Sequence, residues 1–432
     1  MENVQYIVEG GHKLSGEYIP SGNKNAALPI IAAALLCDEP VVLENVPRIR
    51  DVEVMLLLMQ AVGAKTTWTN NNTLRIEANE LKPKELDPDL CARVRASILL
   101  VGPLLVRWGH VTLAPPGGDV IGRRRLDTHF LVFEQLGVKI GLENNYTFSA
   151  KNLISSDIFL DEPSVTATEN ALCAAAGAEG TTILRNCASE PHVQDLANFL
   201  VSMGVDIEGI GTNVMTIHGG RRPLSGTNYR IGPDHIEVGS IIGLAASTKS
   251  KITIRNAGVQ YLRSTLMNFE RLGVECEISG DDLIVSENQS LKIMSDFGGY
   301  IPKIEDQPWP AFPADTMSIA IVTATQCDGV VLVFEKMFES RLFFVDKLIA
   351  MGARIVLCDP HRVIVIGPTK LKAAQIESPD IRAGMAMLIA AMCAKGTSTI
   401  SNAQQIERGY EHISERLNEM GAKIIRVVTK SR

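Results

Sequence analysis

Two kinds of helical segment alternate along the chain, and the pattern returns six times. Segments of the first kind are amphipathic, as in L-A-N-F-L-V-S-M-G-V-D-I, and each ends in a glycine that a short β-type run follows. These glycines are Gly63, Gly137, Gly204, Gly273, Gly352 and Gly421. A helix that turns directly into a strand favours glycine, because the end of the helix often needs a positive φ. The recurrence predicts six similar structural units.

Segments of the second kind consist of small and apolar residues, as in A-G-M-A-M-L-I-A-A-M-C-A. They begin near Ala26, Ala92, Thr168, Val238, Thr316 and Arg382. Helices that are apolar nearly all round are buried, so we expect these six to form an inner layer. Alternating strand patterns such as G-T-T-I-L-R-N follow several of them. The pattern therefore predicts an α/β fold of six βαβαβ-type repeats, three in each of two similar domains.

Length and charge agree with this organisation and narrow the class of protein. A chain of 432 residues is longer than one hydrophobic core usually supports, which favours two domains. The net charge of -7 and the pI near 5.7 argue against a partner nucleic acid. The eight cysteines are scattered without a C-x-x-C pair, so neither a disulfide framework nor a metal site is expected.

The sequence also suggests where the protein works. Its first residues, M-E-N-V-Q-Y-I-V-E-G, lack the basic and apolar segments of a secretion signal. The longest apolar run, 26–37, is interrupted by Pro29 and is too short to span a bilayer. We therefore expect a cytoplasmic protein with no membrane partner.

One stretch, 114–128, carries candidate chemistry on a loop. It reads A-P-P-G-G-D-V-I-G-R-R-R-L-D-T, and its prolines and glycines disfavour a helix or a central strand and leave it able to move. Asp119 and three consecutive arginines, 123–125, lie on it. Guanidinium groups on such a loop suit a phosphate or carboxylate, which they bind through two parallel hydrogen bonds. A solvated surface turn with a chance run of charges is the alternative.

Polar residues stand at the expected starts of the inner helices. Lys24 and Asn25 precede the first helix, while Asp315 and Asp380 precede the fifth and sixth. Free N–H groups at helix starts favour anions, so a cleft where such ends converge between the two halves would bind an anionic ligand. Each Asp taken alone is more often a simple helix cap.

Six motifs together resemble those of the UDP-N-acetylglucosamine 1-carboxyvinyltransferases, the enolpyruvyl transferases that open bacterial peptidoglycan synthesis. They are S-G-N-K-N-A-A-L-P (21–29), V-R-A-S (94–97), P-P-G-G-D-V-I-G-R-R-R-L-D-T-H (115–129), P-A-F-P-A-D (310–315), S-P-D-I-R-A (378–383) and I-E-R-G-Y-E (406–411). The resemblance implies an inside-out α/β barrel with its active site between two domains. The first domain would be 22–232, carrying the mobile loop, and the second 1–21 plus 233–432.

The resemblance also implies the reaction and the residues that carry it. The enolpyruvyl group of phosphoenolpyruvate would move to the 3-hydroxyl of GlcNAc in UDP-GlcNAc, with release of phosphate and without a metal or organic cofactor. Catalytic residues would be Asp119, Asp315, Lys24 and Asp380, with Asp234 a weaker candidate. Phosphoenolpyruvate would be bound by Lys24, Asn25, Arg95, Arg124 and Arg408. UDP-GlcNAc would be bound by Asn25, Arg95, Arg124, Leu126, Asp127, Ser164, Val165 and Asp315. We expect a monomer or a weak homo-oligomer.

Two positions depart from the commonest family pattern. Asp119 stands where many members carry Cys, and Thr166 stands where Gly is usual after Ser-Val. A carboxyl at position 119 can serve as an acid if its pKa is raised; neighbouring arginines would lower that pKa, whereas burial on loop closure would raise it. Because a carboxylate attacks an epoxide less readily than a thiolate does, fosfomycin is expected to form no covalent adduct here.

Three other functions are compatible with parts of the sequence. Transfer of the enolpyruvyl group to shikimate 3-phosphate would use the same architecture, but S-G-N-K-N replaces the G-S-K-S type of opening expected there. A non-catalytic relative that only binds a nucleotide sugar or a protein would not require Lys24, Arg124, Asp315, Asp380 and Arg408 together. A purely structural repeat protein would have no reason to carry the arginine-rich loop.

Overall fold

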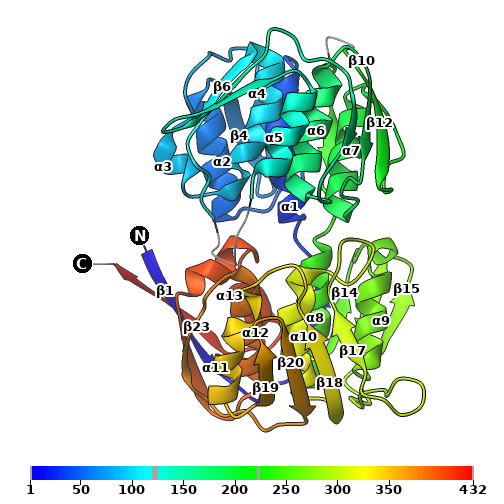
Figure 1. Cartoon of the computed structure of the whole chain (residues 1–432). Helices are drawn as coiled ribbons and strands as arrows, with labels where there is room; N and C mark the ends of the chain where they lie inside the picture. The colour runs from blue at the N-terminus through cyan, green and yellow to red at the C-terminus, as the bar shows by residue number, and fades with distance from the viewer. Residues whose placement is uncertain (1, 119–124, 221–223, 431–432) are drawn as a thin grey trace. The chain divides into compact units, whose positions relative to one another are not determined.

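The structure is a computed structural model that describes residues 2–118, 125–220 and 224–430, and Asp119 and Arg124 lie outside these residues (Figure 1). The described residues separate into two compact units. The first, called here the inserted unit, comprises the described residues between 22 and 232. The second, the bipartite unit, comprises residues 2–21 together with 233–430.

The six inner helices have formed where small and apolar residues cluster. They are α1 (Lys24–Ala33), α4 (Val101–Trp108) and α6 (Val165–Gly177) in the inserted unit, and α8 (His235–Thr248), α10 (Met317–Ala324) and α12 (Ile381–Cys393) in the bipartite unit. All eight residues of α10 are buried. In the bipartite unit α8, α10 and α12 pack on one another. The prediction of six buried helices is therefore confirmed.

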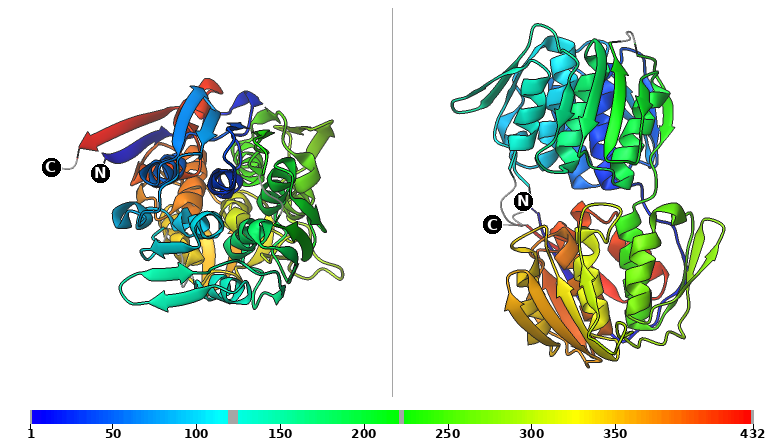
Figure 2. Two further views of the ribbon diagram at one scale, coloured as in Figure 1. Left: turned by 90° about the horizontal axis from the view of Figure 1, so that it is seen from above. Right: turned by 45° about the vertical axis from the view of Figure 1, so that its right-hand side comes forward.

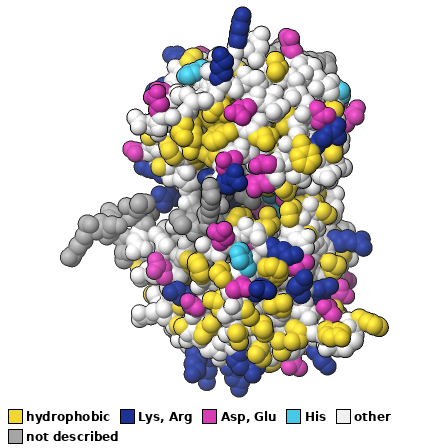
Figure 3. All heavy atoms as spheres, in the orientation of Figure 1, with side chains coloured by type: hydrophobic (Ala, Val, Ile, Leu, Met, Phe, Trp, Pro, Cys, Tyr) yellow, Lys and Arg dark blue, Asp and Glu magenta, His cyan; other side chains and the backbone are white. Residues whose placement is uncertain are grey.

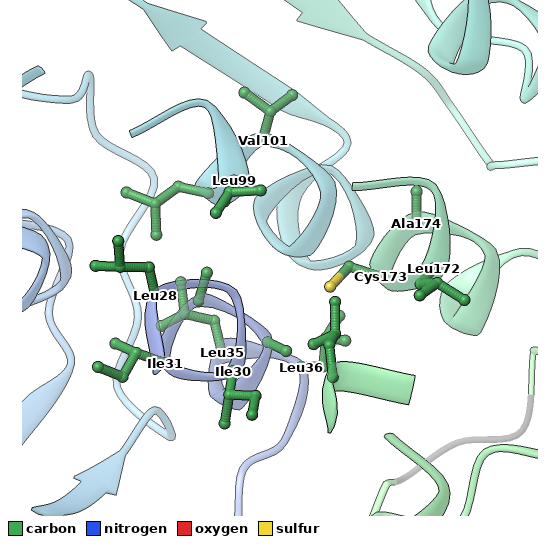
Figure 4. Close-up of a cluster of buried hydrophobic side chains, with 14 of the residues drawn as sticks. Leu28, Ile30, Ile31, Leu35, Leu36, Leu99, Val101, Leu172, Cys173 and Ala174 are labelled. Carbon is green, nitrogen blue, oxygen red and sulfur yellow. The ribbon is translucent and has the colours of Figure 1, made fainter. Parts of the chain in front are cut away.

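The core of the inserted unit forms where its inner helices meet. This core includes Leu28, Ile31 and Leu35, together with Leu99 and Cys173 from neighbouring segments (Figure 4). The second inner helix differs from the others because the chain reaches it in steps, through α3 (Pro88–Cys91) and the 3-10 helix η2 (Arg95–Leu100). All five of these labelled side chains are buried, so the converging helices form one continuous apolar centre.

The amphipathic segments form the outer helices. They are α2 (Arg50–Ala61), α5 (Asp127–Gln135), α7 (Pro191–Ser202), α9 (Arg263–Arg271), α11 (Val345–Ala350) and α13 (Ile413–Glu419). The glycine after each has a positive φ, between 77° and 105°, which confirms the predicted role of all six glycines. α5 begins at Asp127, so the last two residues of the predicted loop 114–128 belong to a helix.

Strands of the inserted unit form three sheets in its described residues. In strand order these are β13 (Asn228–Arg230), β3 (Val41–Glu44), β5 (Thr73–Glu77) and β4 (Lys65–Asn70); β6 (His110–Leu113), β8 (Tyr146–Ser149) and β7 (Lys139–Leu142); and β11 (Asp206–Glu208), β12 (Val214–Gly219), β10 (Gly180–Arg185) and β9 (Asp157–Phe159). In the three repeats of the inserted unit, the predicted last strand is thus a hairpin of two strands, as in β11 and β12.

The described part of the bipartite unit likewise contains three sheets, each of four strands. In strand order these are β15 (Cys276–Ser279), β16 (Asp282–Val285), β14 (Lys251–Ile254) and β2 (Ser15–Tyr18); β17 (Lys303–Glu305), β18 (Gly329–Phe334), β20 (Arg362–Gly367) and β19 (Arg354–Asp359); and β21 (Gln375–Glu377), β22 (Thr397–Ser401), β1 (Glu2–Glu9) and β23 (Ile424–Lys430). β1 pairs antiparallel with both β22 and β23, and Figure 2 shows β1 (blue) beside β23 (red).

A strand directly precedes each point where the chain passes from one unit to the other. β2 directly precedes α1, yet it pairs in parallel with β14, which follows α8. β13 directly precedes α8, yet it pairs in parallel with β3, which follows α1. Gly22 lies between β2 and α1 at a position where a Cβ would approach the carbonyl oxygen of Asn45 to 1.7 Å. Each unit therefore takes one strand from the chain segment that leads into the other.

Candidate active site

Three aspartates lie at the starts of the inner helices of the bipartite unit. Asp234 caps α8, accepting hydrogen bonds from the backbone N–H groups of Ile236 (2.9 Å) and Glu237 (3.2 Å). Asp380 caps α12 in the same way, at 2.8 and 2.9 Å. Asp315 lies in the 3-10 helix η4 (Ala314–Thr316), directly before α10, and makes no such cap. Its carboxylate is therefore left for other partners.

Asp315 is bound by two buried guanidinium groups. One Nη of Arg341 lies 2.8 Å from one carboxylate oxygen, and Nε of Arg382 lies 3.2 Å from the other. Burial alone would raise the pKa of Asp315, but the charges and hydrogen bonds of Arg382 and Arg341 outweigh it and hold that pKa below its ordinary value. Asp315 is thus a carboxylate at any working pH.

Arg341 begins the 3-10 helix η5 (Arg341–Phe344), and the loop before it aims the side chain. Its guanidinium stacks over the ring of Phe338 at 4.8 Å, and its Nε lies 4.0 Å from the buried carboxyl of Glu335. Burial and the neighbouring Asp306 raise the pKa of Glu335 to about 9. The carboxylate of Asp306 accepts hydrogen bonds from two backbone N–H groups of the loop, those of residues 336 and 337. The loop is therefore fixed by carboxyl groups behind the site.

Arg408 lies in a third segment of the same unit, the 3-10 helix η6 (Ala403–Arg408), which packs on α12. It is partly buried and donates a hydrogen bond to Gln405 at 2.9 Å. Arg382, at the start of α12, stacks over Tyr410 just beyond η6, with 5.4 Å between the guanidinium carbon and the ring centroid. The predicted residues Asp315, Asp380 and Arg408 thus lie on elements that Arg382 connects.

In the inserted unit, Lys24 and Asn25 do not precede α1, as predicted, but form its first two residues. Asn23 is the cap, accepting a hydrogen bond from the backbone N–H of Asn25 at 2.8 Å. The ammonium group of Lys24 is largely buried and lies 2.7 Å from the carboxylate of Asp51, which is also buried. The pair neutralises a charge that burial would otherwise disfavour.

Arg95 and the residues after the loop lie close together in the same unit. Arg95 begins η2 and donates a hydrogen bond at 3.0 Å to the backbone carbonyl of Arg125. Arg125 in turn lies 2.7 Å from Asp127, the first residue of α5, and Leu126 between them is buried. The structure thus brings together Arg95, Leu126 and Asp127 of the predicted nucleotide-sugar residues.

Ser164 and Val165 stand at the start of α6. Ser164 is the N-cap residue, but its side chain makes no capping hydrogen bond. Oγ1 of Thr166, the departure from the family pattern, lies 3.0 Å from Nε2 of His129; His129 is buried, whereas Thr166 is partly exposed. Burial and the charge of Arg95 lower the pKa of His129 to about 3. His129 was missed by sequence reasoning, although it closes the motif at 115–129.

Arg341 and Arg382 were also missed. Arg382 could have been predicted as a site residue, because it follows Asp380 by two residues inside the S-P-D-I-R-A motif. Arg341 could not have been predicted in this way, since it lies 26 residues from Asp315 in a stretch without a motif. As for a metal, the part of the chain that the structure describes contains no group of three His, Cys, Asp or Glu residues able to hold one.

Comparison with known proteins identifies the family. The family model described as EPSP synthase (3-phosphoshikimate 1-carboxyvinyltransferase) matches residues 8–417. A UDP-N-acetylglucosamine 1-carboxyvinyltransferase of Bradyrhizobium diazoefficiens is 68% identical and aligns over 99% of both chains. This chain belongs to the UDP-N-acetylglucosamine 1-carboxyvinyltransferase family. A member of the family from Treponema denticola is 53% identical and aligns over 97% of this chain and 98% of its own.

Solved structures place the fold of this family member among the enolpyruvyl transferases. The enolpyruvyl transferase NikO of Streptomyces tendae has a TM-score of 0.87 and 25% identity, with full coverage of both chains. An EPSP synthase of Acinetobacter baumannii has a TM-score of 0.76 at 18% identity, covering 98% of this chain and 100% of its own, which bears on the fold alone. The expected enolpyruvyl transferase fold is confirmed.

On the face in Figure 3, acidic and basic side chains are interspersed. Within the described ranges, no helix combines the length and the apolar character that crossing a membrane requires.

Proposed function

We propose that this chain transfers the enolpyruvyl group of phosphoenolpyruvate to the 3-hydroxyl of GlcNAc in UDP-GlcNAc and releases phosphate, the first committed step of peptidoglycan synthesis in the cytoplasm. The observation that carries the proposal is the alignment at 68% identity over 99% of both chains with a relative of that name. The helix starts carry the two kinds of group that this reaction needs: cations that bind phosphate and carboxylate, and carboxylates that move protons. Residues of both units would act on the same substrates.

Phosphoenolpyruvate carries a phosphate and a carboxylate, and both require cations. Lys24, Arg124 and Arg408 would bind it, with Asn25 and Arg95 beside them. Arg341 and Arg382 extend this set, because both are buried guanidinium groups beside a carboxylate that the reaction uses. Neutralising the phosphate favours its departure as a leaving group.

The reaction would proceed by addition and elimination. In the addition, the sugar O3 bonds to C2 of phosphoenolpyruvate, Asp315 takes the O3 proton, and Asp119 donates a proton to the methylene carbon C3. The product is a tetrahedral intermediate that retains the phosphate. In the elimination, C3 returns a proton to Asp119, the C2–O bond to phosphate breaks with its electron pair, and the C2–C3 double bond reforms. Asp380 would assist at the tetrahedral centre.

The pairing of Asp315 with two arginines has a consequence for its role as base. A carboxylate whose pKa is held below its ordinary value takes up a proton poorly. The anionic groups of phosphoenolpyruvate would compete for Arg341 and Arg382 and so weaken their hold on Asp315. Substrate binding would then make Asp315 more basic at the moment when the sugar hydroxyl must lose its proton.

For the nucleotide sugar we propose the residues at the starts of η2, α5 and α6. These are Asn25, Arg95, Arg124, Leu126, Asp127, Ser164 and Val165, with Asp315 at the sugar hydroxyl. The uncapped N–H groups of α6 suit a phosphate of the nucleotide. No metal or organic cofactor enters this scheme, and we propose a monomer or a weak homo-oligomer.

Phosphate release from phosphoenolpyruvate tests the reaction. It would be measured with UDP-GlcNAc and with shikimate 3-phosphate, for the wild type, Asp119→Asn and Asp119→Cys. We expect release with UDP-GlcNAc only, lost in the Asn variant and retained in the Cys variant. Release with shikimate 3-phosphate would identify the sister reaction instead. Tight binding of UDP-GlcNAc without release would identify a non-catalytic binding protein.

Asp119 also predicts the response to fosfomycin. After incubation with UDP-GlcNAc and the drug, intact-mass spectrometry is expected to show no adduct on the wild type and one adduct on Asp119→Cys, because the thiolate is the better nucleophile. A stable adduct at Asp119 would contradict this proposal while leaving the transfer reaction untouched.

A further inference from the structure

A chain of buried hydrogen bonds begins at Asn170 in the middle of α6. The backbone N–H of Gly102 donates to Oδ1 of Asn170 at 3.0 Å, and Nδ2 of Asn170 donates to the carbonyl of Ile98 at 2.9 Å. Gly102 allows this approach, since a Cβ there would lie 2.9 Å from the same Oδ1. Turning the amide over would face donor to donor and acceptor to acceptor, so these two backbone groups fix its orientation.

The orientation of Asn170 fixes the proton on His129. Nδ2 of Asn170 lies 3.0 Å from Nδ1 of His129, and because Nδ2 can only donate, Nδ1 must accept. His129 is 1% exposed, and its low pKa keeps the ring neutral at working pH. The single ring proton therefore lies on Nε2.

His129 in turn fixes the direction of the Thr166 hydroxyl. Nε2–H lies 3.0 Å from Oγ1 of Thr166 and donates to it, so the proton of that hydroxyl points away from the ring. Thr166 is partly exposed, and no acceptor for its proton is found among the residues that the structure describes. The start of α6, where Thr166 is the second residue, also lacks a side-chain cap. A hydroxyl proton and uncapped backbone N–H groups thus face outward together, and both suit an anionic oxygen.

We propose that Thr166 donates its hydroxyl proton to a phosphate oxygen of the nucleotide sugar, and that His129 and Asn170 are positioning residues that hold it as a donor. This inference rests on the proposed function, because it assigns a contact within the nucleotide-sugar site. Arg95, whose charge acts on His129, supplies positive charge to the same neighbourhood. Glycine, usual at this position, could offer a backbone N–H but no hydroxyl.

Binding measurements by calorimetry test the contact. The probes are UDP-GlcNAc, UDP and uridine, and the proteins are the wild type, Thr166→Ser and Thr166→Val. Losing a hydrogen bond to a charged group is expected to weaken UDP-GlcNAc and UDP about tenfold in the Val variant, with uridine unchanged. The Ser variant keeps the hydroxyl and is expected to stay within about threefold of the wild type.

A matched control comes from the same helix. Thr168→Val removes a hydroxyl that donates to the Ser164 carbonyl and accepts from the Ala188 N–H, so it should lower the Tm without weakening UDP. Equal UDP binding by the wild type and Thr166→Val would overturn the inference, as would an equal loss for uridine. A wild type that binds none of the three probes would instead contradict the proposed function.

The proton assignment has its own measurement. In 15N-labelled protein, the ring of His129 is expected to give the signature of the neutral form with the proton on Nε2, unchanged between about pH 5 and pH 9. A proton on Nδ1, or a titration in that range, would overturn the positioning role of His129 and Asn170.

Discussion

The same helix start carries opposite chemistry in the two units. In the bipartite unit, Asp234 and Asp380 occupy the first N–H groups of α8 and α12 with their own carboxylates. In the inserted unit, α1 begins with the cation Lys24 and a neutral cap, and α6 begins without a side-chain cap. An anionic ligand can therefore use the first N–H groups of α6 in the inserted unit, whereas those of α8 and α12 in the bipartite unit are already bound by carboxylates. The repeat supplies similar positions, and single residues decide their charge.

Replacing Asp315, the aspartate of the bipartite unit that caps no helix, should have the largest effect on activity. Asp315→Asn leaves Arg341 and Arg382 without a counter-charge and removes the base, so kcat is expected to fall about 1000-fold. Steady-state phosphate release measures it. Asp359→Asn is the control, because Asp359 forms a solvent-accessible pair with Arg362 and should leave kcat within about twofold. Similar losses in both variants would show that charge alone, not position, matters.

Removing the carboxylate that pairs with the buried Lys24 of the inserted unit should lower the stability of the fold. Asp51→Asn leaves the buried ammonium of Lys24 without its partner, and the free energy of unfolding in urea is expected to fall by about 3 kcal/mol. Glu80→Gln removes the partner of Lys65 in an exposed pair and should change it by less than about 0.5 kcal/mol. If the two losses were equal, the burial of Lys24 would have no energetic consequence.

The acid behind Arg341 should make stability depend on pH. Because the pKa of Glu335 is raised to about 9, the folded chain holds one proton more than the unfolded chain between the ordinary Glu pKa and pH 9. Stability from this group is therefore complete at low pH and declines as pH rises. Glu335→Gln has no such titrating group, so its free energy of unfolding relative to the wild type should increase by on the order of 5 kcal/mol from pH 5 to pH 9.

Urea denaturation at several pH values measures this difference. Asp306, which raises the Glu335 pKa, and Arg341, which lowers it, both face the group, so Asp306→Asn should reduce the pH dependence without abolishing it. A stability difference between wild type and Glu335→Gln that stays constant with pH would mean that Glu335 is ionised in the folded chain.

The smallest expected effects are on the free energy of unfolding when the glycine after an outer helix is replaced in either unit. Gly204 of the inserted unit has φ of 99°, and the space that a Cβ would occupy there is open, so Gly204→Ala should cost only about 1 kcal/mol of unfolding free energy. At Gly273 of the bipartite unit a Cβ would lie 2.4 Å from the backbone nitrogen of Lys292, so the cost there should be larger. Equal costs in urea denaturation would show that the backbone near Lys292 yields freely.

Sequence patterns predicted the structural features that depend on residues close together in the sequence. The six glycines and the six buried helices follow from local periodicity and local backbone needs, and the structure bears out both. Lys24 was placed one step outside α1 because Asn23, a better cap, competes for the same turn. The contact of Arg341 with Asp315, the pairing of β13 with β3, and the bond of Thr166 to His129 arise from tertiary packing, which no local pattern records.

The strand pairings also determine the order in which the two units can fold during synthesis. A ribosome makes β1 before the other strands described above, and its partners β22 and β23 are among the last of them. β2 must wait for β14 in the same way, whereas every strand partner within the inserted unit has been made once residue 230 has emerged. The inserted unit can therefore fold while later strands are still being synthesised, whereas β1 has unpaired edges until β22 and β23 have been made.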